Sequence, residues 1–173
     1  MDSSYRDARY KEWFDRVDAD KNGQLDCSEL QKSLALSNLK FSLVTIGQLI
    51  RVHDRTNTGT ITLEEFKDLH RFLRAATKTF RQLDVDKKGS LTYDEVWTAI
   101  QIAGISMDRN RAFQRMVISF DPQRKRSLDL AEFIRLKLYI QCAISTFHAF
   151  NSDNTGKVTL SCNQFLYAAA NVL

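Results

Sequence analysis

A twelve-residue pattern that occurs five times constrains the fold of this 173-residue chain more than any other feature of its sequence. Each copy begins with Asp or Asn and has a branched apolar residue at its eighth position, and four of the five have glycine at the sixth. A repeat of this kind predicts copies of one supersecondary unit. Aligned on the residue before the next helix, the copies begin at Asp18, Asp54, Asp84, Asp121 and Asn151.

The first copy contains a complete set of oxygen ligands for a divalent cation. Ca²⁺ takes six to eight oxygens, and an EF-hand loop supplies them from positions 1, 3, 5, 7, 9 and 12. Gly23 stands at position six, where the backbone turns into a conformation that disfavours a side chain. The sequence therefore predicts a calcium site in loop one (18–29), with Glu29 as its bidentate ligand. Its ligands are Asp18, Asp20, Asn22, the carbonyl of Gln24, Asp26 and Glu29.

The spacing of the loops predicts how the helix–loop–helix units are connected. Their first residues are 36, 30, 37 and 30 positions apart. The short intervals leave only 66–83 and 133–150 between two loops, without glycine or proline and with apolar residues at alternating steps of three and four. Such a period indicates one amphipathic helix in each interval. Hands one and two are therefore expected to pair, as are hands three and four, with short antiparallel strands at the eighth loop positions.

These features predict an all-α fold of the EF-hand superfamily, with five EF-hands, two shared long helices and short antiparallel loop strands. One domain is expected to span 1–173. Its loops are 18–29, 54–65, 84–95, 121–132 and 151–162, the last with a two-residue insertion.

Five hands, two shared helices and near-equal steps between loops one, three and five resemble the penta-EF-hand family. The resemblance covers the chain from about Tyr10. In the last hand the aromatic Phe165 comes two residues late, which is similar to the programmed cell death protein 6-like branch of that family. The resemblance implies that the first and third hands are the usual calcium sites.

The other loops are less complete than loop one. Loop three is expected to bind Ca²⁺ more weakly, because Lys88 places an ammonium at position five; its ligands are Asp84, Asp86, the carbonyl of Ser90 and Glu95. Loop two has hydroxyls in place of carboxylates and is a weaker candidate, with Asp54, Thr58, the carbonyl of Thr60 and Glu65. Loop four is expected to bind no metal, since it contains Gln123, Lys125 and Arg126. Loop five offers Asn151, Asp153 and Thr155, but ends on Cys162 or Gln164 instead of an acid.

The net charge is +4, with a sequence pI near 9.0. The excess lies wholly in 75–173, with dense groups at 109–115 and 124–126. Two interpretations stay open, a solvated basic face and attraction to anionic lipid or an acidic partner.

Other function classes find less support in the sequence. The segment Met1–Arg6 lacks the apolar core of a signal peptide, so none is expected. No segment reaches the roughly 20 apolar residues of a membrane span. Three irregularly spaced cysteines predict neither a disulfide framework nor a zinc site. His53, His70 and His148 are expected as core-edge or surface residues, so no enzyme is predicted.

Two functional hypotheses remain. The first is a calcium sensor and adaptor that exposes a groove for proline-rich peptide segments, as similar proteins do in membrane trafficking, membrane repair or cell-death signalling. The alternative is a basic membrane- or nucleic-acid-associated protein with structural calcium, or a calcium buffer; nucleic acid is disfavoured. The expected location is the cytoplasm or nucleus, with calcium-dependent membrane association.

The odd number of hands predicts dimerisation through the fifth. An unpaired strand edge and an apolar helix face would both find partners in a second hand. The partner is expected to be a second copy or another penta-EF-hand protein. The predicted interface residues are Phe147, Val158, Phe165 and Leu166.

Overall fold

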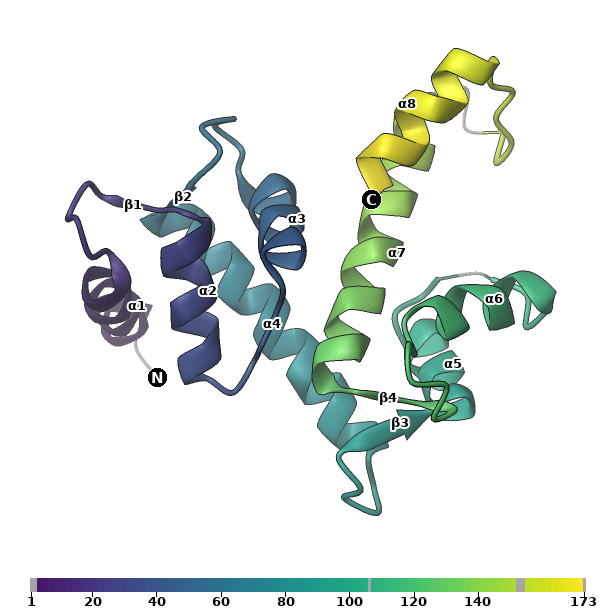
Figure 1. The fold of residues 1–173 in the computed structure, drawn as a ribbon, viewed down its shortest axis with the longest axis horizontal. Helices are drawn as coiled ribbons and strands as arrows, with labels where there is room; N and C mark the ends of the chain where they lie inside the picture. Colours follow the sequence, from purple (N-terminus) through teal and green to yellow (C-terminus); the bar gives the residue numbers. More distant parts are fainter. Residues whose placement is uncertain (1–2, 106, 152–154, 173) are drawn as a thin grey trace.

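The computed structural model describes residues 3–105, 107–151 and 155–172 (Figure 1). Over these ranges the chain forms eight helices and four short strands. Their order is α1 (Ser3–Val17), β1 (Gln24–Leu25), α2 (Cys27–Leu36), α3 (Leu43–His53), β2 (Ile61–Thr62), α4 (Leu63–Leu83), β3 (Ser90–Thr92), α5 (Tyr93–Ile102), α6 (Arg111–Ser119), β4 (Ser127–Asp129), α7 (Leu130–Phe150) and α8 (Cys162–Val172). The predicted all-α EF-hand fold is confirmed. No helix in the described ranges is both long and apolar enough to cross a bilayer.

The last residues of each loop start the helix that follows. In α2 the carboxylate of Asp26 accepts from the N–H of Glu29, and the Glu29 carboxylate accepts from the N–H of Asp26, a reciprocal capping box. The same arrangement begins α4, α5 and α7 at Thr62 with Glu65, Thr92 with Glu95, and Asp129 with Glu132. The ninth and twelfth loop residues therefore have a structural duty besides any contact with a cation.

Short antiparallel strands join the hands in the predicted pairs. Leu25 lies opposite Ile61, and Leu91 lies opposite Leu128. All four side chains are fully buried, so the eighth position of each loop is part of the core. In the described part of loop five, 155–161, no residue is in a strand.

Two hydrophobic cores fill the two pairs of hands, and the shared helices connect them. Phe66 and Leu73 of α4 belong to the first core, whereas Phe80 belongs to the second. On α7, Ile134 lies in the first core and Phe133 in the second. That the whole chain forms one domain remains a prediction, which these bridging helices support.

The fifth hand lies apart from both cores. Helix α8 packs along the distal half of α7, and its N-terminal end projects away from the other helices (Figure 1). It has no buried residue. At its end, the Arg51 guanidinium of α3 donates to the carbonyls of Ala170 and Asn171 at 3.2 and 3.3 Å, where a cation is favoured by the helix dipole.

Candidate metal centre

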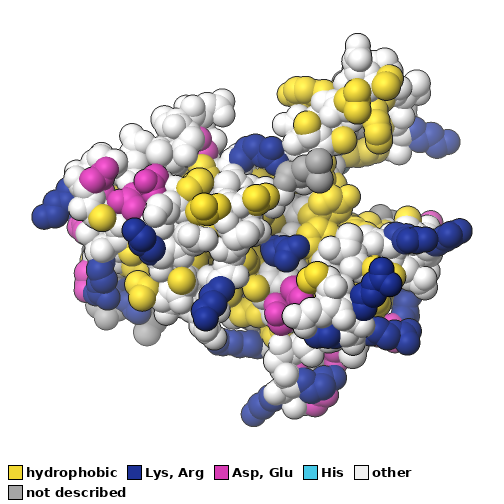
Figure 2. Space-filling view, viewed as in Figure 1, with side chains coloured by type: hydrophobic (Ala, Val, Ile, Leu, Met, Phe, Trp, Pro, Cys, Tyr) yellow, Lys and Arg dark blue, Asp and Glu magenta, His cyan; other side chains and the backbone are white. Residues whose placement is uncertain are grey.

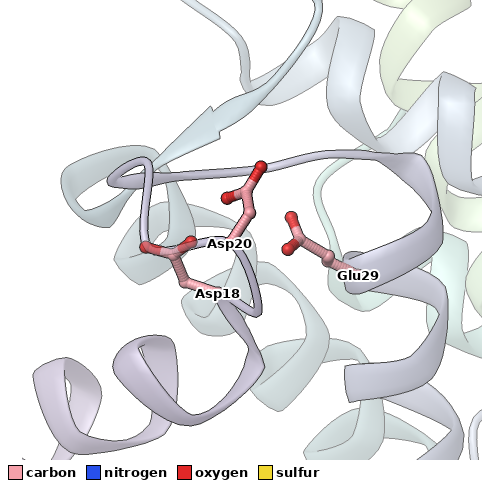
Figure 3. Close-up of side chains that lie close together, drawn as sticks. All are labelled: Asp18, Asp20 and Glu29. Carbon is pink, nitrogen blue, oxygen red and sulfur yellow. The ribbon is translucent and has the colours of Figure 1, made fainter.

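Loop one brings three carboxylates together. Ligand oxygens of Asp18, Asp20 and Glu29 all lie within 4.8 Å of one another. Figure 3 shows their side chains converging, two from the loop after α1 and the third from the first turn of α2. No ion pair neutralises any of the three among the described residues. Such an oxygen-rich, uncompensated set fits a hard divalent cation such as Ca²⁺.

Backbone amides hold these carboxylates in place. Asp18 is buried, and its two oxygens accept from the N–H groups of Asn22 and Gly23 at 3.1 and 2.9 Å. Glu29 accepts from Ala19 N–H at 2.8 Å and from Asp26 N–H at 3.0 Å. Gly23 has φ +80°, as its position in the pattern predicts. The loop is therefore preorganised around the space between Asp18 and Glu29.

The remaining predicted ligands of loop one lie around the same turn. The Asn22 amide donates to Asp20 at 2.8 Å, and its oxygen accepts from Gln24 N–H at 2.8 Å. The carboxylate of Asp26 is engaged with the first turn of α2 through Ser28 and Glu29 N–H groups. Direct coordination by Asp26 would compete with these bonds, in keeping with a ligand that acts through water.

Loop two has the same frame with a hydroxyl between its two carboxylates. The Thr56 hydroxyl lies 3.2 Å from both Asp54 and Glu65, and the Thr58 hydroxyl bonds with that of Thr60 at 2.8 Å. Burial would raise the pKa of Asp54, but hydrogen bonds from Gly59, Thr58 and Thr56 outweigh it and lower the pKa. Burial would likewise raise the pKa of Glu65, but hydrogen bonds from Thr62, Arg55 and Thr56 outweigh it and lower the pKa. Both acids are thus held ionised, while Thr56 bridges the space between them. The role of Thr56 was not predicted from the sequence.

Loop three does not gather its carboxylates as loop one does. The Lys88 ammonium lies 2.8 Å from Asp86, and this hydrogen bond is the main reason that the pKa of Asp86 lies below its ordinary value. Asp84 has one oxygen that accepts from Gly89 N–H at 2.9 Å and another that is buried without a hydrogen bond to any described residue. An orphaned buried carboxylate oxygen is costly without a partner, so it fits a cation site. The predicted site therefore offers the free Asp84 oxygen to a cation, while the Lys88 ammonium competes with the cation for Asp86.

Loop four contains a cation of its own. The Lys125 ammonium at position five reaches the Glu132 carboxylate at position twelve, 3.3 Å away. Asp121 accepts from the N–H groups of Lys125 and Arg126 at 3.0 and 2.7 Å, and from the hydroxyl of Tyr93 at 2.9 Å. Burial and this last bond raise the pKa of Tyr93 to about 12. The link between Tyr93 of hand three and Asp121 of hand four carried no signal in the sequence pattern.

Loop five ends on Gln164. Ser161 N–H donates to the Gln164 side chain at 2.9 Å, and Gln164 N–H donates to the Ser161 hydroxyl at 3.3 Å. This repeats the Asp26–Glu29 arrangement, so Gln164 takes the twelfth position and Leu160, four residues earlier, corresponds to Leu25. The sequence placed the eighth position at Val158 and left the end of the loop open between Cys162 and Gln164; these hydrogen bonds favour Gln164. Asp153, named as a ligand candidate, lies outside the described residues.

Paired helix–loop–helix units around a carboxylate-rich loop define a calcium-binding EF-hand protein. A family model described as EF hand matches 11–35 and 77–100, which contain the whole of loop one and the whole of loop three. A solved structure of a homolog of programmed cell death 6 protein from Leishmania major Friedlin is 31% identical, with a TM-score of 0.71. The similarity covers 95% of this chain and 94% of that one.

Longer proteins also match. Peflin from Danio rerio is 27% identical over 91% of this chain and 59% of peflin. Calpain small subunit 2 from Mus musculus is 28% identical over 79% of this chain and 55% of that protein. The chain therefore spans less than two thirds of the length of these curated relatives. It belongs to the penta-EF-hand family, as the resemblance implied, and is related to programmed cell death 6 protein and peflin.

Proposed function

We propose that this protein is a calcium-dependent adaptor, without enzymatic activity, that binds a peptide segment of a partner protein in an apolar groove. The groove has a volume of about 370 Å³ and lies between α5 and α7, with Thr79 of α4 at its side. Its floor is buried and apolar, and Ile102 on its rim is 67% exposed. The lining residues that form the floor are Ala99, Ile100, Phe133, Leu136 and Ile140.

One observation carries this proposal: α5 connects a predicted calcium ligand to the groove. Its first turn contains Glu95, which closes loop three, and its last turn supplies Ile100 and Ile102 to the groove. In sensor EF-hands, cation binding changes the angle between the helices of a hand and exposes apolar surface. A cation that draws Glu95 toward Asp84 would therefore move the helix that forms one wall of the groove.

Among the described residues that line the groove, one is charged. Lys137 of α7 lines it, and burial lowers the pKa of this lysine. No ion pair or hydrogen bond of its ammonium occurs within the described ranges. A segment that placed a carboxylate or a free carbonyl opposite Lys137 would compensate this charge. Proline-rich segments suit such a site, since their extended backbone leaves carbonyls unpaired.

Calcium and salt separate groove binding from attraction to the basic surface. A labelled proline-rich peptide should bind in calcium, lose binding in chelator, and keep most of its affinity when salt is raised from about 0.1 M to about 0.3 M, because apolar contacts are little screened. Ile102→Asp should abolish binding, whereas Val44→Asp, an equally exposed apolar position on α3, should not. Peptide binding that is the same in calcium and in chelator, and that is unchanged by Ile102→Asp, would overturn the proposal.

We further propose that the chain forms a dimer through hand five, with a second copy or another penta-EF-hand protein. Support comes from α8, on which Phe165 and Leu166 are about 60% exposed, at 61% and 59%. Phe147 on α7 is 36% exposed, so the apolar face continues across both helices. Calpain small subunit 2 is by its name a subunit of an assembly. The cytoplasm or nucleus, with calcium-dependent membrane association, is the location proposed for such an adaptor.

A further inference from the structure

Two groups of arginines that are separate in the sequence line one cleft. Arg109 lies just before α6 and Arg115 lies in the middle of that helix. Arg124 and Arg126 belong to loop four. All four line a cavity of about 500 Å³ beside Tyr93. Figure 2 shows Lys and Arg side chains gathered at the end of the molecule formed by α5, α6 and the β3–β4 pair. The fold therefore concentrates the excess positive charge of 75–173.

Little of this charge is compensated. Arg109 pairs with Asp94, the one acidic residue among the described residues that line the cleft. Arg115, Arg124 and Arg126 have no ion pair in the described parts of the chain. Three unpaired guanidiniums around one cavity repel one another, so a bound anion would lower the energy of the cleft.

The backbone under one of these arginines is strained. Arg126 has φ +61°, in the left-handed region that side chains disfavour. The φ of +53° at Arg124 is shared by the fourth position of loops one to three, so it is a general property of the loop. Arg126 stands at the sixth loop position, where loops one to three have Gly23, Gly59 and Gly89 with φ from +75° to +80°. A side chain kept where glycine fits without strain points to a functional use of that side chain.

The carboxylates of loop four are not available to bind a cation. The Lys125 ammonium is directed to Glu132, and Asp121 accepts from two backbone amides and Tyr93. The carboxylates that would hold Ca²⁺ are thus engaged internally, while the neighbouring arginines face outward into the cleft. Guanidinium groups bind phosphate through paired, planar hydrogen bonds.

We propose that this cleft is a binding site for a phosphate-bearing anion with several negative charges, so that hand four has exchanged cation binding for anion binding. The shared chemistry is that of clustered phosphates, whether on a phosphoinositide headgroup or on a soluble inositol polyphosphate. The site does not use the α5–α7 groove and stands independently of the adaptor proposal.

Calorimetry on the full chain with inositol hexakisphosphate, with and without calcium, tests the site directly. Arg115→Gln combined with Arg124→Gln should weaken binding about tenfold or more for each guanidinium removed, as expected for charge-assisted hydrogen bonds. Arg74→Gln combined with Arg81→Gln removes the same two charges from exposed positions on α4 and should leave the affinity within about twofold. An equal loss of anion affinity in the control variant would show that net charge alone controls binding, and would overturn the proposal.

Vesicles distinguish the two sources of the phosphate. Sedimentation with phosphatidylcholine vesicles that contain or lack phosphatidylinositol bisphosphate should show retention only with the phosphoinositide if a headgroup is the ligand. Binding of the soluble polyphosphate without vesicle retention would identify a soluble ligand. Absence of both at millimolar ligand would overturn the site.

Arg126→Gly separates folding from binding. Glycine relieves the left-handed strain, so the variant should melt no lower than the parent chain, yet anion affinity should fall about tenfold. The Ile102→Asp variant should retain full anion affinity, which keeps failure of this site distinguishable from failure of the peptide groove. Unchanged anion binding in Arg126→Gly together with Arg115→Gln would contradict the assignment.

Discussion

The ammonium of Lys125 lies 3.3 Å from the carboxylate of Glu132, so the fifth and twelfth residues of loop four meet where a calcium loop would hold its ion. Glu132 is nearly buried, with 9% of its side chain exposed, and Lys125 is about one third exposed, at 36%. The ammonium of Lys125 thus takes the place that a bound cation has in a calcium loop. Hand four is therefore expected to keep its shape at any calcium concentration.

Lys125→Met should destabilise the protein and should not be rescued by calcium. Methionine keeps the apolar stem but leaves Glu132 without its cation, and a partly buried pair of this kind contributes on the order of 1–2 kcal/mol. The expected change in melting temperature is a few degrees, since about 1 kcal/mol corresponds to roughly 2–4 °C at this chain length. Scanning calorimetry with calcium and with chelator measures it.

Lys87→Met is the matched control, an exposed loop lysine with no ion pair in the described ranges. It should shift the melting temperature by less than about 1 °C. Full recovery of Lys125→Met in calcium would show that loop four accepts the ion after all.

Glu29→Ala should remove the tighter calcium site. Both oxygens of the bidentate ligand are lost, and the remaining Asp18 and Asp20 leave the loop open at one end, so the affinity is expected to fall on the order of 100-fold or more. Isothermal titration calorimetry counts the sites. Because the substitution also removes the capping box of α2, Glu29→Gln, which keeps one acceptor for that helix, should be measured beside it.

Glu64→Ala is the control. It removes an exposed acid from the first turn of α4 in hand two and should leave the tight site of loop one intact. If Glu29→Ala and Glu29→Gln both retained tight binding, the ion would have to bind elsewhere.

Lys88→Asp should strengthen calcium binding in loop three. The change removes the ammonium that holds Asp86 and supplies an oxygen at position five, so Asp86 becomes free to join Asp84. An increase in affinity of about tenfold or more corresponds to roughly 1.4 kcal/mol. Calorimetry should show this increase with the loop-one site unchanged.

Lys87→Asp introduces the same charge change one residue earlier, at a side chain without an ion pair among the described residues, and should have a smaller effect. Equal gains in both variants would mean that general electrostatics, and not release of Asp86, controls the loop.

Periodicity and ligand spacing predicted much of this architecture. The intervals between loops predicted α4 and α7 as shared helices, and the eighth-position rule predicted the pairs Leu25–Ile61 and Leu91–Leu128. Both signals depend on a repeat, so errors at one copy are corrected by the others. The same reasoning predicted that loop one has the most complete ligand set, which agrees with its gathered carboxylates.

What sequence reasoning missed depends on side-chain direction and on contacts between hands. The sequence pattern does not show that Lys125 contacts Glu132 while Arg124 and Arg126 line the cleft, because the direction of each side chain depends on how the loop is folded. The register of loop five was likewise ambiguous until the Ser161–Gln164 hydrogen bonds settled which residue closes it.

His70 should make stability fall on mild acidification. Burial, and secondarily the charge of Arg74, lower the pKa of His70 below 6.5, and its ring contacts Tyr10 and Trp13. The folded state therefore binds the proton more weakly than the unfolded state. The stabilisation is complete above pH 6.5 and is lost as the pH falls toward the lower folded pKa.

Each unit by which the pKa is lowered corresponds to about 1.4 kcal/mol of lost stability once the pH is below both values. His70→Phe keeps the ring packing and should flatten the dependence of unfolding free energy on pH between about 7 and about 5. His148→Phe, an exposed site, should leave the slope as it is. An unaltered slope in His70→Phe would assign the effect to other groups, such as His53, whose pKa burial also lowers.

Phe165→Asp with Leu166→Asp should convert a dimer into a monomer. These side chains lie on α8, which has no buried residue, and an isologous contact would cover both copies of the face at once. Sedimentation velocity should show a dimer of the unaltered chain at micromolar concentration in chelator, because the Gln164 end of loop five offers no acid to a metal. Reductant must be present, since Cys162 is exposed and could cross-link two copies. Val44→Asp places the same charge on an apolar residue that is 73% exposed on α3 and should remain dimeric. A monomer from the unaltered chain would contradict homodimerisation, and a dimer that survives both α8 substitutions would place the contact elsewhere.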